Sequence, residues 1–216
     1  MFTGLGNLGG LSLRNNEISD IQDGTFNSIP QLTRLNLSNN KLTTLRSDMF
    51  TGLGNLEYLY LNNNDITDIQ AGTLNPTSQL RILNLRNNHI QTIPSNLLAN
   101  LLQLRYLRLS GNNITTLPSV AYDILSSIST VIIGNNPWQC NCRMVEFRLK
   151  MNGSYPFENQ ITCSQPDSLH GLKLKDVSPE DLICEGPTTG LMSPVTYPPP
   201  TTVATEIPET STVQNF

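Results

Sequence analysis

The chain has 216 residues, of which 14% are charged, and a formal net charge of −4. This acidic, charge-poor composition argues against a nucleic-acid binder, and the sequence contains neither an apolar run of about 20 residues that would span a membrane nor a leader with the features of a signal peptide. The two histidines, His89 and His170, lie far apart in the sequence, which argues against a histidine-based metal or catalytic cluster.

A repeat with a period of 24 residues runs from Leu8 to Asn136. Each copy has the form L-x-x-L-x-L-x-x-N-x-[LI], with aliphatic replacements in the last copy. The asparagine recurs in every copy: Asn16, Asn40, Asn64, Asn88, Asn112 and Asn136. This phase-locked pattern is typical of leucine-rich repeats.

The alternation in L-x-L is that of a half-buried strand, which cannot bury its leucines alone. Stacked repeats pair such strands in parallel and share one core. We therefore predict an α/β solenoid over residues 1–135, a leucine-rich repeat horseshoe with a parallel sheet on its concave side and turns or short helical pieces on its convex side. The repeated asparagine suits a buried turn, because its amide both donates and accepts hydrogen bonds.

The first residues repeat a later segment: Met1–Leu8 is identical in sequence to Met49–Leu56. We therefore expect the array to begin within a repeat and to lack an N-terminal cap. Either the chain is part of a longer protein, or another element covers the first strand edge, since an open edge invites strand pairing.

All four cysteines follow the last repeat, at Cys140, Cys142, Cys163 and Cys184. The spacing lacks two close C-x-x-C pairs, so we favour disulfides in an oxidising compartment over a zinc site. Cys140 and Cys142 are too close to bridge each other comfortably, which leaves two pairings open. Residues 136–185 are therefore predicted to form a cysteine-rich cap.

The segment from Asn136-Pro137-Trp138 to Cys184 resembles the C-terminal flanking cap of extracellular leucine-rich repeat proteins. That group includes Slit ligands, platelet glycoprotein Ib, Toll-like receptors and the variable lymphocyte receptors of jawless vertebrates. The resemblance implies the pairs Cys140–Cys163 and Cys142–Cys184, and it implies that Trp138 plugs the end of the repeat core.

Residues 186–216 differ in kind, with six prolines, ten serines or threonines, and no lysine or arginine. Such a composition cannot bury a core, and it predicts a disordered, extended stalk that could carry O-linked glycans. A Thr/Pro-rich stalk after a cysteine cap is similar to that of variable lymphocyte receptors, where it leads toward a membrane anchor. A plain flexible linker is the alternative interpretation.

Side chains that alternate with the strand leucines should point onto the concave face, from the third, fifth and seventh positions of each repeat. Besides glycine, serine, threonine and asparagine, these positions hold tyrosines, arginines and isoleucines, and none of them holds an acidic residue. The predicted ligand-binding residues are Arg34, Tyr58, Tyr60, Ile82, Asn84, Arg86, Tyr106, Arg108 and Ile132. Tyr and Arg are frequent hot-spot residues, and Arg grips carboxylate, phosphate or sulfate, so we expect an anionic ligand. Strand propensity and solubility are the competing explanations.

Three sequons predict N-glycosylation, at Asn36, Asn113 and Asn152. We expect Asn152, in the cap loop 151–160, to be modified most readily. A glycan on Asn36 would block part of the predicted face, so concave binding requires Asn36 to be unmodified.

The sequence contains no visible nucleophile–base set, phosphate loop or metal constellation. We therefore predict no enzyme activity, no cofactor and no metal. The expected function is recognition: an extracellular receptor, secreted or tethered by its stalk, that resembles variable lymphocyte receptors and binds a protein or glycan antigen, such as an anionic microbial surface component. The alternative is an adhesion or guidance protein that binds an extracellular protein partner.

Overall fold

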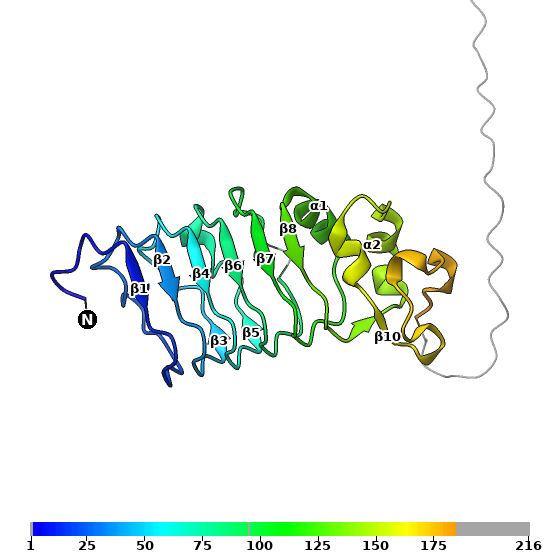
Figure 1. The fold of residues 1–216 in the computed structure, drawn as a ribbon, viewed down its shortest axis with the longest axis horizontal. Helices are drawn as coiled ribbons and strands as arrows, with labels where there is room; N and C mark the ends of the chain where they lie inside the picture. Colours follow the sequence, from blue (N-terminus) through cyan, green and yellow to red (C-terminus); the bar gives the residue numbers. More distant parts are fainter. Residues whose placement is uncertain (1, 95, 185–216) are drawn as a thin grey trace, which may run out of the picture. The chain divides into compact units, whose positions relative to one another are not determined.

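Six short strands, one from each repeat, form a single parallel sheet in the order β1-β2-β4-β6-β7-β8 (Figure 1). The structure is a computed structural model, and it describes residues 2–94 and 96–184. The predicted stalk, 186–216, lies outside the described residues. The strands of the sheet are β1 (Gly10–Ser12), β2 (Arg34–Asn36), β4 (Tyr58–Tyr60), β6 (Ile82–Asn84), β7 (Tyr106–Arg108) and β8 (Thr130–Ile132).

Strand register follows the 24-residue repeat without a shift along the sheet. Leu11 pairs with Leu35, Leu35 with Leu59, and this alignment continues to Val131. From the second repeat onward the inward leucines are buried, as shown by Leu59 and Leu61, both 0% exposed. The predicted solenoid with a parallel sheet is confirmed.

The opposite side of the solenoid carries the returning chain. Two short segments, β3 (Thr44–Leu45) and β5 (Asp68–Ile69), pair in parallel there. The other elements between the strands of the main sheet are the 3-10 turn η1 (Asn75–Thr77) and the helix α1 (Ser119–Ser127). Apolar side chains of the returning chain, including those of Phe50 in a turn after β3 and Leu125 in α1, complete the core from this side.

From the second repeat onward, the repeated asparagines form a buried ladder between neighbouring repeats, whereas Asn16 of the first repeat is exposed. The Nδ2 group of Asn64 donates to the carbonyl oxygens of Leu37 and Leu61, each at 3.0 Å, and its Oδ1 accepts from the backbone N–H of Leu42 at 3.1 Å. Asn40, Asn88, Asn112 and Asn136 make the same kind of contacts. The structural interpretation of these asparagines is confirmed, because each satisfies buried backbone groups of two repeats.

A second asparagine ladder, which the sequence analysis missed, runs beside the first. Asn15, Asn39, Asn63 and Asn87 all have positive φ, between 53° and 59°. Each side chain from Asn39 onward donates to the one before it, at 2.6 to 2.9 Å. Gly111, with φ 68°, ends the ladder. Most repeats open this turn with two consecutive asparagines, and this dipeptide is the sequence feature that could have predicted the second ladder.

The cap contains β9 (Trp138–Gln139) paired with β10 (Cys163–Gln165), the helix α2 (Val145–Lys150) and short 3-10 turns. These turns are η2 (Cys142–Met144), η3 (Pro156–Gln160), η4 (Asp167–Leu169), η5 (Leu174–Asp176) and η6 (Pro179–Asp181). Disulfides join Cys140 to Cys163 and Cys142 to Cys184, the pairing that the resemblance implies. Trp138 is 1% exposed, in the same core cluster as the last repeat.

The cap also covers the last edge of the sheet. The Oε1 atom of Gln160 accepts from the backbone N–H of Ile133 at 2.9 Å, and its Nε2 group donates to the carbonyl oxygen of Val131 at 3.0 Å. The Gln160 side chain therefore makes hydrogen bonds that a further strand would make with β8, and it protects a sheet edge that would otherwise be free to pair.

At the other end of the array, the first repeat is less buried. Leu8, Leu11 and Leu13 are only half-buried, whereas Leu35 and Leu37 of the second repeat are 0% exposed. The predicted absence of an N-terminal cap stays a prediction. None of the helices in the described part of the chain has the length and apolar character needed to cross a membrane.

Candidate binding face

The outward side chains of the main sheet form the candidate site, which we call the open face. Strand register places Arg34, Tyr58, Ile82 and Tyr106 in one row, in that order. The same register places a second row beside it, made of Asn36, Tyr60, Asn84, Arg108 and Ile132. Each of these residues is exposed or half-buried, whereas the leucine between the two rows is buried. The sequence-predicted residues are thus brought together on one surface.

The third predicted row, from the seventh repeat position, is less uniform. Arg86 is exposed, but Ser38 and Ser110 are buried, at 3% and 8% exposure. Ser38 turns back to donate its hydroxyl to Oδ1 of Asn36 at 2.7 Å. The expectation that this whole row faces outward is therefore wrong for the two serines: a short hydroxyl side chain can bond back to its own strand, as Ser38 does, whereas the longer Arg86 side chain reaches solvent.

Tyr106 and Arg108 form a preorganised pair on β7. The Arg108 guanidinium carbon lies 4.9 Å from the centre of the Tyr106 ring. Its Nε and Nη2 groups donate to the tyrosine hydroxyl at 3.1 and 2.6 Å. The cation is therefore held in place by stacking and hydrogen bonding, so little side-chain entropy would remain to be lost if it bound an anionic group.

Asn84 is held by its neighbours at the centre of the face. Its Nδ2 group donates to Oδ1 of Asn62 at 3.1 Å, and its Oδ1 atom accepts from the backbone N–H of Arg86 at 3.1 Å. These contacts fix the side chain between the Tyr58–Ile82–Tyr106 row and Arg86.

The open face is positively charged although the whole chain is acidic. Among the described residues, Arg34, Arg86 and Arg108 take part in no ion pair. Arg81, on the flank of the sheet, is paired with Glu57 at 3.3 Å instead. The arrangement can attract anionic groups to a surface that also offers tyrosine rings and isoleucine side chains.

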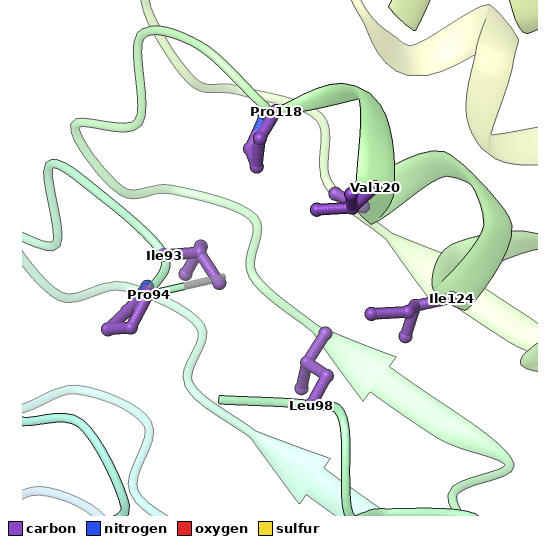
Figure 2. Close-up of a pocket in the computed structure, with 7 residues that line it drawn as sticks. Ile93, Pro94, Leu98, Pro118, Val120 and Ile124 are labelled. Carbon is purple, nitrogen blue, oxygen red and sulfur yellow. The ribbon is translucent and has the colours of Figure 1, made fainter. Parts of the chain in front are cut away.

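A small apolar pocket lies on the return side, away from the open face (Figure 2). Its lining consists of Ile93, Pro94, Leu98, Pro118, Val120, Ala121 and Ile124. These side chains offer no nucleophile, acid or base. The described residues also contain no group of three or more metal-ligating side chains. This pocket therefore supplies no chemistry for a reaction.

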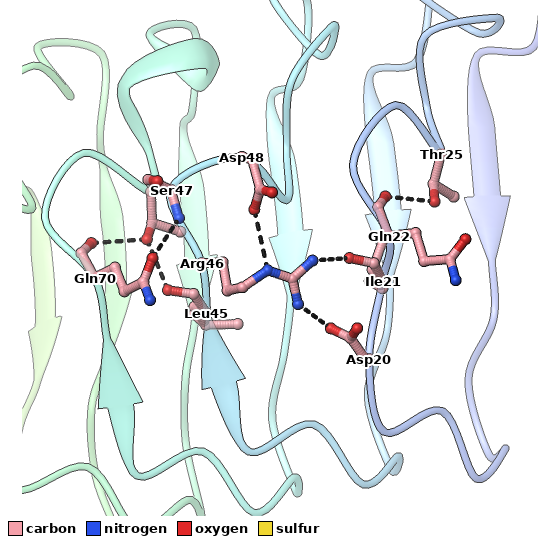
Figure 3. Close-up of polar contacts among 10 residues, drawn as sticks. Asp20, Ile21, Gln22, Thr25, Leu45, Arg46, Ser47, Asp48 and Gln70 are labelled. Carbon is pink, nitrogen blue, oxygen red and sulfur yellow. Dashed lines mark hydrogen bonds and ion pairs between the residues drawn. The ribbon is translucent and has the colours of Figure 1, made fainter.

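A polar cluster on the return side is structural (Figure 3). Arg46 pairs with Asp20 and with Asp48, the latter at 3.2 Å, and donates from Nη2 to the carbonyl oxygen of Ile21 at 2.7 Å. The hydrogen bond to Asp20 is the main cause that raises the pKa of Arg46. The guanidinium thus links neighbouring returns of the chain, and its nitrogens are engaged within the protein.

The three sequons lie in different settings. Asn36 is half-buried on β2, with Oδ1 engaged by Ser38, whereas Asn113 and Asn152 are exposed. The loop that holds Asn152 lies between α2 and η3. Glycosylation at these positions stays a prediction.

Stacked parallel strands, an open face and a disulfide-linked cap define a repeat solenoid with an extended surface suited to binding. Family comparison agrees: the model of the leucine rich repeat matches residues 6–66, 59–114 and 78–137. The model of the leucine rich repeat C-terminal domain matches residues 160–185. The chain belongs to the leucine-rich repeat family. Proteins of this family are generally non-catalytic recognition proteins, and the disulfides and C-terminal domain fit an extracellular protein.

Proposed function

We propose that this protein is a recognition receptor of the variable-lymphocyte-receptor type, which binds a protein or glycan antigen on its open face. One observation carries the proposal: on the open face, the tyrosines lie beside three arginines, Arg34, Arg86 and Arg108, that have no carboxylate partner among the described residues. Large aromatic and arginine side chains on a rigid strand array supply binding energy with little ordering cost.

The preferred antigen is an anionic one, with carboxylate, phosphate or sulfate groups next to a sugar or apolar surface. Arg86 and Arg108 would hold the anionic oxygens, and the rings of Tyr58 and Tyr60 would pack against the neighbouring surface. An anionic microbial surface component has this chemistry. We further propose that the receptor is extracellular, secreted or tethered through residues 186–216.

An adhesion or guidance receptor for an extracellular protein partner is the second candidate. It rests on the same open face, because tyrosine and arginine are equally suited to protein partners. A binding screen that sets anionic microbial polysaccharides against extracellular matrix proteins separates the two candidates. Capture of the polysaccharides supports the immune receptor, and capture of matrix proteins alone supports the adhesion receptor.

The site itself is tested by charge reversal. The double variant Arg86→Glu/Arg108→Glu should weaken binding of the captured ligand by at least roughly ten-fold. Arg143→Glu is the matched control, because Arg143 is an exposed arginine in the cap rather than on the open face. Equal binding by the double variant, the control and the unmodified protein would falsify the assignment of the open face.

A further inference from the structure

The loop between α2 and η3 holds the one Asn-Gly dipeptide of the sequence, Asn152-Gly153. Both residues are exposed. Gly153 has φ +82°, and the space around its missing Cβ is open to 4 Å. The Gly153 nitrogen is therefore unhindered by any side chain of its own, which favours its attack on the preceding asparagine.

A buried carboxylate accepts a hydrogen bond from the backbone N–H of Gly153. Glu158 is 0% exposed, and its Oε2 atom accepts from the backbone N–H of Gly153 at 2.7 Å. Its Oε1 atom accepts from the hydroxyl of Tyr122 at 2.8 Å. In the described residues Glu158 has no cationic partner. A carboxylate that is buried without a cation is costly, and here it is directed at one peptide group.

The side chain of Asn152 is folded back over the same peptide. Its Oδ1 atom accepts from the backbone N–H of Ser154 at 3.0 Å, which closes an Asx-turn around Gly153. A donor on this oxygen polarises the side-chain carbonyl and stabilises the negative charge that develops on it during attack. The nucleophile, a base and an oxyanion donor thus converge on Asn152.

We propose that Asn152 is a self-modifying site that deamidates through a cyclic imide, with Glu158 as the general base. The Gly153 nitrogen forms a bond to Cγ of Asn152 and gives its proton to the Glu158 carboxylate. The Cγ–Nδ2 bond then breaks, and the proton passes to the departing nitrogen, which leaves as ammonia. Water opens the imide at either carbonyl, which leaves an aspartyl or an isoaspartyl residue and adds one negative charge to the cap.

Glycosylation at the same position would block this reaction. Asn152-Gly153-Ser154 is also a sequon, and an N-linked glycan would occupy Nδ2, the nitrogen that must leave. The two modifications compete for one atom. Asn152 would therefore deamidate only in chains that did not receive a glycan at this position during synthesis.

The test uses the intact protein from a host that does not add N-glycans, held at mildly alkaline pH and sampled by peptide mass spectrometry. Glu158→Gln keeps the size of the side chain and an acceptor for Gly153 but removes the base, so it should slow modification of Asn152 by roughly ten-fold. Glu146→Gln, an exposed glutamate on α2, is the matched control and should leave the rate unchanged.

A second comparison needs no variant at Glu158. The folded protein should modify Asn152 several-fold faster than the same chain with its disulfides reduced in urea, because only the fold brings Glu158 to Gly153. In a host that adds N-glycans, Ser154→Ala removes the sequon but keeps the backbone donor, and it should restore deamidation. The proposal is overturned if folded Glu158→Gln protein reacts as fast as the unmodified one, or if unfolding accelerates the reaction.

Discussion

Removal of one side chain from the buried asparagine ladder tests how the repeats are joined. In the Asn88→Ala variant, the backbone N–H of Ile66 loses its acceptor, which lies at 3.1 Å. This donor is buried, and an orphaned buried group costs about 1–3 kcal/mol. The carbonyl oxygens of Leu61 and Leu85 also each lose a donor at 3.0 Å.

Both carbonyl oxygens keep a hydrogen-bond partner in the variant, because each accepts from the amides of two ladder asparagines. Leu61 keeps the amide of Asn64 at 3.0 Å, and Leu85 keeps that of Asn112 at 2.9 Å. Their loss is therefore that of an ordinary hydrogen bond, about 0.5–1.5 kcal/mol each. With the orphaned N–H, the expected destabilisation is about 2–6 kcal/mol.

The matched control is Asn16→Ala, at the equivalent position of the first repeat. Asn16 is exposed and donates only to the carbonyl oxygens of Leu13 and Arg14. Its loss should cost under about 1 kcal/mol, since water replaces both contacts. Urea unfolding followed by circular dichroism measures both variants. If Asn88→Ala were no more destabilised than Asn16→Ala, the ladder would not be what holds neighbouring turns together.

Three further predictions concern the cap and the end of the second asparagine ladder at Gly111. Replacement of Cys142 and Cys184 by serine should lower the free energy of unfolding by about 2–4 kcal/mol, measured by urea titration, and an unchanged midpoint would contradict it. Burial, and then the hydrogen bond to Glu158, raise the pKa of Tyr122. Because the unfolded tyrosine then loses its proton first, the stability that Tyr122 confers should be present below about pH 10 and decline above it. In thermal melts, the Tyr122→Phe variant should therefore lose less stability above about pH 10 than the unmodified protein does. Identical dependence of the melting temperature on pH in the two proteins would refute the reasoning. At Gly111, with φ +68°, a substituted Cβ would lie 2.4 Å from Oδ1 of Asn87, the movable end of a side chain. Gly111→Asn should therefore lower the melting temperature less than Gly111→Ala, because asparagine tolerates this conformation and can extend the ladder; the reverse order would count against it.

The positions of the open-face residues were predictable because the sequence repeats at a constant interval. With one strand in each period, the register of the whole sheet follows from the spacing of Leu35, Leu59 and Leu83. Alternation along each strand then assigns the outward positions, among them Tyr60 and Arg108. Sequence reasoning failed for Ser38, because its side chain turns back to donate a hydrogen bond to Asn36 of the same strand.

The amino-acid sequence by itself determined the solenoid, its parallel sheet, the rows of the open face and the role of the buried asparagines. Each of these depends on local periodicity, which is the same in every repeat. Only the tertiary structure decided between the two disulfide pairings that spacing left open, brought Gln160 to the last strand edge, and set Glu158 against Gly153. Those contacts lie in the non-repeating cap, where no period relates one residue to the next and packing alone selects the partners.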